Sequence, residues 1–134
     1  INSERETLNE NNIRLATIGD TDSLPQRCRE GLAEAIAATS SNTGMTLILA
    51  LSYSSRWEIV EATRRIAADV EAGKLKASEV NSDLFGTYLT TSKFPDPELL
   101  IRTSGEHRVS NFLLWQIAYA EFYFTETLWP DFGK

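Results

Sequence analysis

The sequence has little cysteine and no long hydrophobic run. Its only cysteine, Cys28, excludes an internal disulfide framework and is typical of a reducing compartment, so we expect a cytoplasmic protein. No run of eighteen or more apolar residues is present, so the sequence predicts no transmembrane segment. No charged segment followed by an apolar one opens the chain, so no signal peptide is expected.

Positive charge is also scarce. The chain carries 13 Lys and Arg against 19 Asp and Glu, for a net charge of −6. A general nucleic-acid binder needs a surplus of positive charge to displace counterions, so we expect no nucleic-acid partner. An anionic ligand would need a few arginines that converge locally. The glycine-rich loops of common nucleotide-binding folds are absent, which disfavours a generic nucleotide-binding module.

Methionine is missing from the first position. The chain begins with Ile1, and its only methionine is Met45. Because an initiator methionine is normally removed only before a small residue, we expect this chain to be a piece of a longer protein, truncated at its N-terminus.

What is present is an alternation of helical and strand patterns. Segment 1–11 is polar and rich in helix formers, and Asp22 or Ser23 could cap a helix that has Pro25 in its first turn. The order of elements predicts an α/β, Rossmann-like fold with a largely parallel sheet and flanking helices, and residues 1–134 as part of a single domain. The strands are expected at 13–19, 45–52, 99–101 and 122–124, and helices at about 25–41, 54–72, 78–89 and 110–120.

Three local patterns refine this expectation. The nearly continuous apolar run at 45–51 predicts a strand covered on both faces. Ser54 or Ser55 offers a cap at the start of the second long helix, and Glu58, three residues beyond Ser55, matches a capping box. Phe112, Trp115 and Tyr119 fall at helical spacing, which predicts that they pack in the core.

The segment after the strand at 99–101 carries the chemistry. It holds Arg102 and Arg108, hydroxyl side chains and Gly105. Guanidinium groups donate charge-assisted hydrogen bonds to phosphate oxygens, glycine lets a backbone approach a ligand, and a helix beginning near Ser110 would add free N–H groups. Two arginines, a serine and a helix start could therefore hold a diphosphate. The alternative is that the arginines form surface pairs, for example with Glu106, and that Ser110 only caps a helix.

Four segments, in order, resemble the cis-prenyltransferase family of the undecaprenyl diphosphate synthase (isoprenyl transferase) kind. Segment 96–124 closely resembles the family signature, and 128–132 matches its tail. Segments 12–20 and 51–59 resemble earlier family stretches, with serines at 54 and 55 where the family usually has glycines. The resemblance covers essentially the whole chain.

The resemblance implies a transferase that condenses isopentenyl diphosphate with an allylic (farnesyl) diphosphate. The product would be a Z-polyprenyl (undecaprenyl) diphosphate used in cell wall biogenesis. It also implies Mg²⁺ as cofactor, a homodimer, and room for a peripheral contact with the inner membrane face through the lipid product.

By the same resemblance, several residues acquire roles. Arg102, Arg108, Val109 and Ser110 would bind the diphosphate of isopentenyl diphosphate. Glu121 would be a metal ligand, with the alternative that it is an exposed carboxylate at a strand entry, and His107 is a secondary candidate.

Two family elements are absent. The catalytic aspartate of a His-x-x-Met-Asp-Gly-Asn-Gly-Arg-Trp motif does not occur, so no catalytic residue is assigned and one is expected upstream of Ile1. The chain also ends at Lys134, shortly before the family's C-terminal Arg-x-Gly element. We therefore expect this chain alone to be inactive. The alternative is a non-catalytic partner subunit of a prenyltransferase complex, against which retention of the diphosphate-binding residues weighs.

Overall fold

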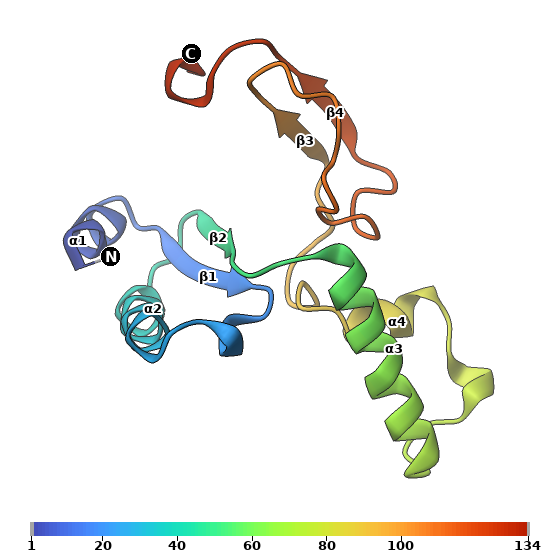
Figure 1. Cartoon of the computed structure of the whole chain (residues 1–134). Helices are drawn as coiled ribbons and strands as arrows, with labels where there is room; N and C mark the ends of the chain where they lie inside the picture. Colours follow the sequence, from blue (N-terminus) through green and yellow to red (C-terminus); the bar gives the residue numbers. More distant parts are fainter. Residues whose placement is uncertain (1, 134) are drawn as a thin grey trace. The chain divides into compact units, whose positions relative to one another are not determined.

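The computed structural model describes residues 2–133, which form two compact units, Ile1–Tyr53 and Ser54–Lys134 (Figure 1). Ile1 and Lys134, from which truncation was argued, lie outside the described residues. Among the residues that are described, no helix is both long and apolar enough to span a membrane.

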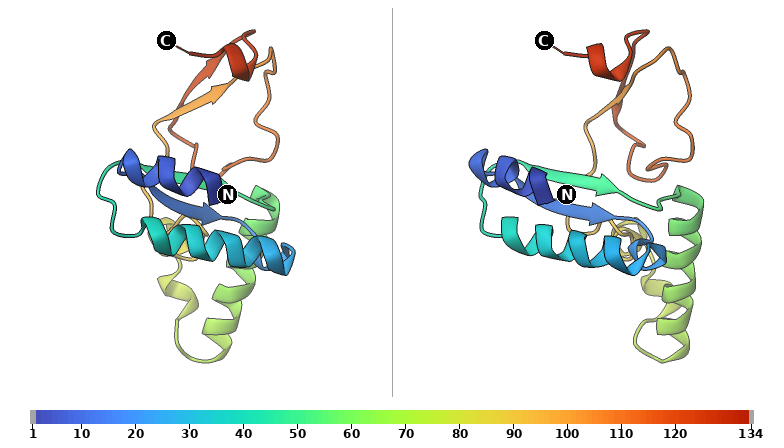
Figure 2. Two further views of the ribbon diagram at one scale, coloured as in Figure 1. Left: turned by 90° about the vertical axis from the view of Figure 1, so that its left-hand side faces the viewer. Right: turned by 60° about the vertical axis from the view of Figure 1, so that its left-hand side comes forward.

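The first unit is a two-stranded parallel sheet with two α-helices. Its elements in chain order are α1 (Asn2–Glu10), β1 (Arg14–Ile18), α2 (Gln26–Thr39) and β2 (Thr46–Ala50), with a short 3₁₀ turn at Thr21–Ser23. β1 pairs with β2 in parallel, and α2 runs alongside this pair (Figure 2). The buried side chains Leu15 and Ile18 of β1, and Leu32 and Ala35 of α2, supply its core.

The carboxyl ends of β1 and β2 approach each other closely. The Leu51 N–H donates to the Ile18 carbonyl at 3.0 Å. Gly19 follows with a φ of +105°, and a Cβ placed there would lie 2.1 Å from the Leu51 carbonyl oxygen. Only glycine satisfies both the backbone angle and this close approach.

The second unit joins a long helix to a second pair of parallel strands. Buried Ala62 and Ile66 of α3, with Leu89 and Ile117, supply its core. β3 pairs with β4 in parallel. The elements are α3 (Ser55–Glu71), α4 (Ser82–Thr87), β3 (Leu99–Arg102) and β4 (Glu121–Phe124), with 3₁₀ turns at Ala77–Glu79 and Trp129–Asp131.

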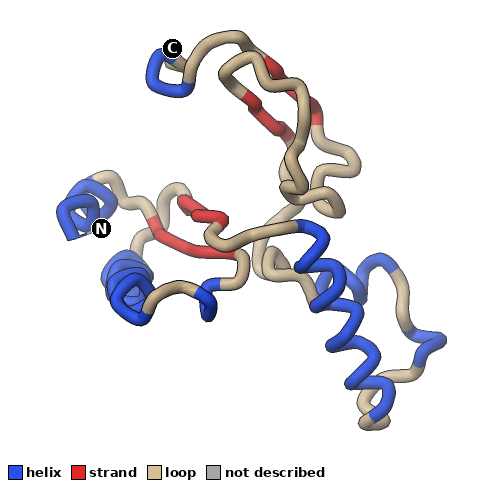
Figure 3. Tube along the Cα trace, viewed as in Figure 1, coloured by secondary structure: helices blue, strands red, loops and turns tan. Residues whose placement is uncertain are grey.

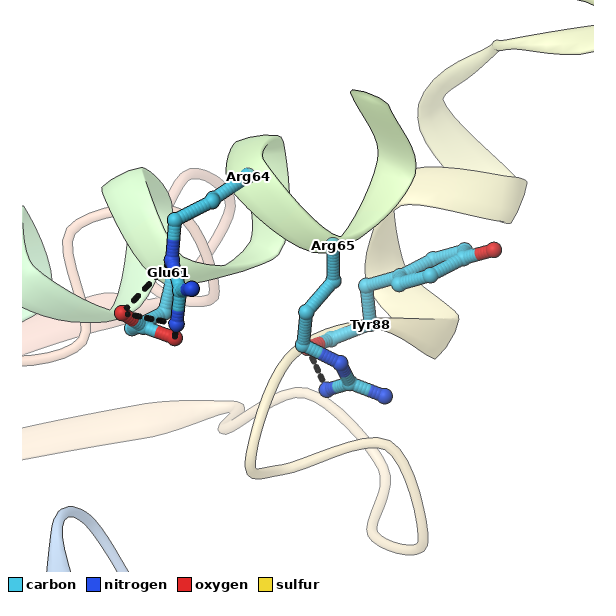
Figure 4. A network of polar contacts seen from close by, with 4 residues as sticks. All are labelled: Glu61, Arg64, Arg65 and Tyr88. Carbon is cyan, nitrogen blue, oxygen red and sulfur yellow. Dashed lines mark hydrogen bonds and ion pairs between the residues drawn. The ribbon is translucent and has the colours of Figure 1, made fainter. Parts of the chain in front are cut away.

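Tyr88, just after α4, fastens this part of the chain to α3. Its hydroxyl donates to Asp69 Oδ2 at 2.5 Å, and its carbonyl accepts from Arg65 Nη1 at 3.2 Å. The Arg65 guanidinium also lies 5.2 Å from the centre of the Tyr88 ring (Figure 4). The hydrogen bond to Asp69 raises the pKa of the Tyr88 hydroxyl, and burial and the Asp69 charge raise it further. At Arg64, which directly precedes Arg65, a hydrogen bond to Glu61 and the charge of Glu61 raise the pKa of the guanidinium (Figure 4).

The α/β class and all four expected strands are confirmed, and both strand pairs are parallel. Two predictions about the first unit were wrong. Leu47 of β2 is 37% exposed, so that strand is not covered on both faces. The residue that precedes α2 is Pro25 rather than Asp22 or Ser23, which belong to the 3₁₀ turn.

The helix predicted over 110–120 does not form. This stretch is a series of turns between β3 and β4, shown as loop in Figure 3. Ser110, Asn111 and Leu113 have φ values of +50°, +60° and +50°, which a right-handed helix cannot contain. The core packing predicted for two aromatic residues was also wrong, because Trp115 is 39% and Tyr119 100% exposed.

At the start of α3, the first of the two predicted caps is confirmed, but the capping box with Glu58 was wrong. The cap is Ser54, whose side chain accepts from the Trp57 N–H at 3.4 Å. Glu58 lies on the buried face of α3, where it is 2% exposed and bonds to other segments.

Candidate functional site

Arg102 is the last residue of β3. It lies level with Phe124 of β4, and its carbonyl accepts from the Thr125 N–H at 3.0 Å. Leu99 and Ile101 are 53% and 42% exposed, whereas the alternate residues Leu100 and Arg102 are half-buried. Since side chains alternate along a strand, Arg102 projects from the more buried face of β3 at its carboxyl end.

The chain turns sharply after Arg102. Ser104 and Gly105 have φ values of +67° and +69°, and their N–H groups donate to the carbonyls of Thr127 and Thr125, each at 2.9 Å. A Cβ on Gly105 would lie 2.8 Å from Glu126 Oε2. The turn is therefore tied to the segment that follows β4, and the predicted need for glycine at 105 has a structural cause.

Arg108 forms an ion pair with Glu106, with 2.6 Å between Nη1 and Oε2. The two side chains are 67% and 37% exposed, and an exposed pair of this kind contributes about 0 to 1 kcal/mol. Hydrogen bonds to a charged partner contribute about 1.5 to 3 kcal/mol each. The surface pairing raised as an alternative is thus present for Arg108.

Ser110 is exposed and has a left-handed backbone, as does Asn111 after it. Such a conformation costs roughly 1 to 2 kcal/mol per non-glycine residue. The predicted free N–H groups of a helix starting at Ser110 are absent, because no helix starts there. Asn111 instead caps α3: its carbonyl accepts from the Ser55 N–H at 2.9 Å and its Oδ1 from the Arg56 N–H at 3.0 Å.

Glu121 lies apart from Arg102, whereas the His107 ring contacts Phe124, the strand partner of Arg102. Glu121 is exposed, opens β4, and is level with Leu99, three residues before Arg102. A strand advances about 3.3 Å per residue, so the two lie about 10 Å apart along the strands, and an offset of three places them on opposite faces. The exposed His107 ring lies 5.4 Å from the Phe124 ring centre.

No group of three or more His, Cys, Asp or Glu side chains that could hold a metal ion occurs within residues 2–133. Glu121 can supply one carboxylate. Mg²⁺ is usually held in proteins by one or two carboxylates together with substrate phosphates, so a single carboxylate fits one ligand position of such an ion.

A buried polar cluster joins α3 to two other segments of this unit. Glu58 Oε1 accepts from the N–H and hydroxyl of Thr90, both at 2.8 Å, and Oε2 accepts from Gln116 Nε2 at 3.1 Å. Gln116 is 3% exposed, and its Nε2 also donates to Thr91 Oγ1 at 2.9 Å. Sequence reasoning missed this cluster. One signal in the sequence could have indicated it: Glu58 lies four residues before Ala62, and therefore on the apolar face of α3.

A surface pocket of about 690 Å³ lies between α4 and the turns after residue 113. Its lining includes Asp83 and Asp96 together with Trp115 and Tyr119. No arginine or lysine lines it, so this pocket does not suit an anion, and the predicted diphosphate-binding residues are not part of it.

Comparisons with known proteins agree along the whole chain. The family model described as undecaprenyl diphosphate synthase matches residues 1–134. An isoprenyl transferase of Porphyromonas gingivalis is 53% identical over 132 residues, covering 98% of this chain and 52% of that protein. A ditrans,polycis-undecaprenyl-diphosphate synthase ((2E,6E)-farnesyl-diphosphate specific) of Aliivibrio fischeri is 47% identical over 134 residues, covering 100% of this chain and 52% of that protein.

Among solved structures, lavandulyl diphosphate synthase of Lavandula x intermedia in complex with dimethylallyl diphosphate is similar, with a TM-score of 0.92 and 44% identity. The match covers 97% of this chain and 56% of that one. The chain spans about half the length of the curated relatives that it matches.

Proposed function

Because the chain belongs to the undecaprenyl diphosphate synthase family of cis-prenyltransferases, we propose that the protein containing it condenses isopentenyl diphosphate with an allylic diphosphate, farnesyl diphosphate, to make a Z-polyprenyl (undecaprenyl) diphosphate. This chain would supply the site for the diphosphate of isopentenyl diphosphate. The activity belongs to the whole protein. The matched relative is about twice as long as this chain.

The observation that supports this proposal is the placement of Arg102 at the carboxyl end of a parallel strand, with Arg108 in the loop that follows. Ligands of α/β proteins bind outside the carboxyl ends of parallel strands. Arg102 has a half-buried side chain there, and Arg108 holds only an exposed carboxylate that a ligand can displace. Two guanidinium groups match the several oxygens of a diphosphate.

Val109 and Ser110 complete the proposed grip. The Ser110 hydroxyl is exposed and can donate to a phosphate oxygen, and Val109 lends backbone between it and Arg108. We propose Glu121 as one ligand of Mg²⁺, whose remaining positions would be filled by diphosphate oxygens and other groups. When bound, the ion would neutralise diphosphate charge.

Partners and location remain proposals. We propose a homodimer, since several large apolar side chains of the second unit are exposed, Trp129 by 69% and Tyr119 by 100%. Light scattering that shows only a monomer at high protein concentration would count against the homodimer. A cytoplasmic protein with peripheral contact to the membrane through its lipid product stays a prediction. No observation favours a non-catalytic partner subunit.

The test is an assay of the full protein that carries this sequence, with labelled isopentenyl diphosphate, farnesyl diphosphate and Mg²⁺. We expect labelled long-chain Z-polyprenyl diphosphate. Arg102→Ala should raise the KM for isopentenyl diphosphate by about tenfold or more, since a charge-assisted bond contributes about 1.5 to 3 kcal/mol. A full protein that makes no polyprenyl product from these substrates refutes the proposal.

The 134-residue chain assayed alone should give no product, because its sequence contains no catalytic aspartate motif. Turnover by the chain alone would show that this expectation is wrong and would leave the family assignment unchanged.

A further inference from the structure

The first turn of α3 is capped by a residue far along the chain. In most helices the first N–H groups bond to a side chain at the cap or to water. Here the Ser55 and Arg56 N–H groups donate to the carbonyl and the Oδ1 of Asn111, at 2.9 and 3.0 Å. Ser54 caps only the Trp57 N–H.

Asn111 and Leu114 also donate hydrogen bonds to side chains at the start of α3. Asn111 Nδ2 donates to Ser54 Oγ at 2.7 Å, and the Leu114 N–H donates to Ser55 Oγ at 2.8 Å. Four hydrogen bonds thus fasten Asn111 and Leu114 to the start of α3. We call this set of residues, Ser54, Ser55, Arg56, Asn111 and Leu114, the α3 clamp.

The clamp holds a backbone that would not keep its shape unaided. Ser110, Asn111 and Leu113 all have positive φ values. Non-glycine residues remain in this region only where surrounding structure fixes them. Asparagine is among the residues that tolerate it, and its side chain satisfies both a donor and an acceptor of the clamp.

We propose that Asn111 is a positioning residue for binding of the diphosphate of isopentenyl diphosphate. It acts through its neighbours, because Ser110 adjoins it directly and Arg108 precedes it by three residues. The clamp fixes the backbone from which the Ser110 hydroxyl and the Arg108 guanidinium project. Without it, this backbone relaxes to ordinary φ values, and the two side chains change position relative to each other. This inference rests on the proposed function.

A merely structural role for Asn111 would affect stability and nothing more, so the test needs a control that also loses a helix-capping asparagine. Asn81 provides it, since its Oδ1 accepts from the Leu84 N–H at 2.9 Å as the cap of α4, in the same unit. Asn81→Ala removes a helix-capping asparagine, as Asn111→Ala does. Asn81 is no part of the proposed diphosphate-binding loop.

The experiment measures separate KM values for isopentenyl diphosphate and farnesyl diphosphate in the full protein that carries this sequence. Asn111→Ala should raise the KM for isopentenyl diphosphate by about tenfold, equal to about 1.4 kcal/mol, and leave that for farnesyl diphosphate within twofold. Asn81→Ala should change neither. Ser54→Ala should also raise the KM for isopentenyl diphosphate. Both variants remove the same hydrogen bond, between Asn111 Nδ2 and Ser54 Oγ. The KM increase of the double variant should therefore be smaller than the product of the two single increases.

The outcomes separate this inference from the proposed function. If the wild type turns over and Asn111→Ala changes both KM values equally, or neither, Asn111 is not a positioning residue and the proposed function stands. The same follows if Asn81→Ala reproduces the Asn111→Ala pattern. A wild-type protein without turnover overturns the proposed function and this inference together.

Discussion

Replacing Glu58 by alanine should destabilise the second unit far more than replacing a surface glutamate of the same helix. Glu58 is 2% exposed and accepts hydrogen bonds from the Thr90 N–H, the Thr90 hydroxyl and Gln116 Nε2. Glu58→Ala leaves these donors without that acceptor and opens a cavity. An unsatisfied buried donor costs about 1 to 3 kcal/mol, so a total loss of about 3 to 5 kcal/mol is expected.

The conservative variant should cost less. Glu58→Gln keeps one oxygen for Thr90 but directs an amide donor at Gln116 Nε2. Gln116 can turn its amide over, because its Oε1 is buried and has no hydrogen-bond partner in the structure. The turned amide accepts the new hydrogen bond and leaves its own N–H groups unsatisfied, so we expect a loss of about 1 to 2 kcal/mol.

The assay is urea unfolding at neutral pH, with Glu61→Ala as the matched control. Glu61 lies one turn along α3 and forms an exposed pair with Arg64 at 2.7 Å, which contributes about 0 to 1 kcal/mol. With an m-value of about 2 kcal/mol/M, Glu58→Ala should lower the midpoint by roughly 1.5 to 2.5 M and Glu61→Ala by at most about 0.5 M. Equal shifts for the two alanine variants would show that the buried cluster does not hold the unit together.

The remaining predictions concern the strand ends and Tyr88. Gly19→Ala should lower the free energy of unfolding by about 3 to 5 kcal/mol, because strain at positive φ adds to the clash with the Leu51 carbonyl. Gly73→Ala is the control. Gly73 has a φ of +72° and no atom within 4 Å of an added Cβ, so its replacement should cost only about 1 to 2 kcal/mol. Thermal unfolding checks both, and equal losses would contradict the close approach at Gly19. The raised pKa of Tyr88 means that its protonated form is favoured in the folded state, so its hydrogen bond to Asp69 stabilises fully below pH of about 10 and fades as pH rises through the raised pKa. The stability difference between wild type and Tyr88→Phe should therefore be constant from pH 7 to 9 and shrink above about pH 10, and a difference that grows there would reverse the sign of this reasoning.

The order of helices and strands could be predicted because local patterns dominate it. The apolar runs that became β1, β2 and β3 are bounded by turn residues, and the periodic face of α3 carries Ala62 and Ile66 in its core. Each of these signals lies within a few residues of the element that it specifies.

The turns over 110–120 could not be predicted, because their cause is distant. The aromatic spacing of this stretch suits a helix, but the first N–H groups of α3 take the carbonyl and side chain of Asn111 and hold it at positive φ. The partners lie more than fifty residues apart in sequence, and no local pattern records them. The family resemblance implies roles for Arg102, Arg108 and Ser110. The alternative given for Glu121, an exposed carboxylate at a strand entry, matches its place at the start of β4. The sequence did not show that Arg102 lies three residues further along the paired strands.

The central claim is that the loop after β3 binds a diphosphate through Arg102 and Arg108, and the most direct test is calorimetric titration of the protein with inorganic pyrophosphate. Arg64→Ala is the matched control, since Arg64 is an arginine that is 72% exposed and pairs with Glu61 much as Arg108 pairs with Glu106. We predict that Arg102→Ala and Arg108→Ala each weaken binding by about tenfold or more, and that Arg64→Ala leaves it unchanged. Pyrophosphate binding that is the same in all four proteins would contradict the account.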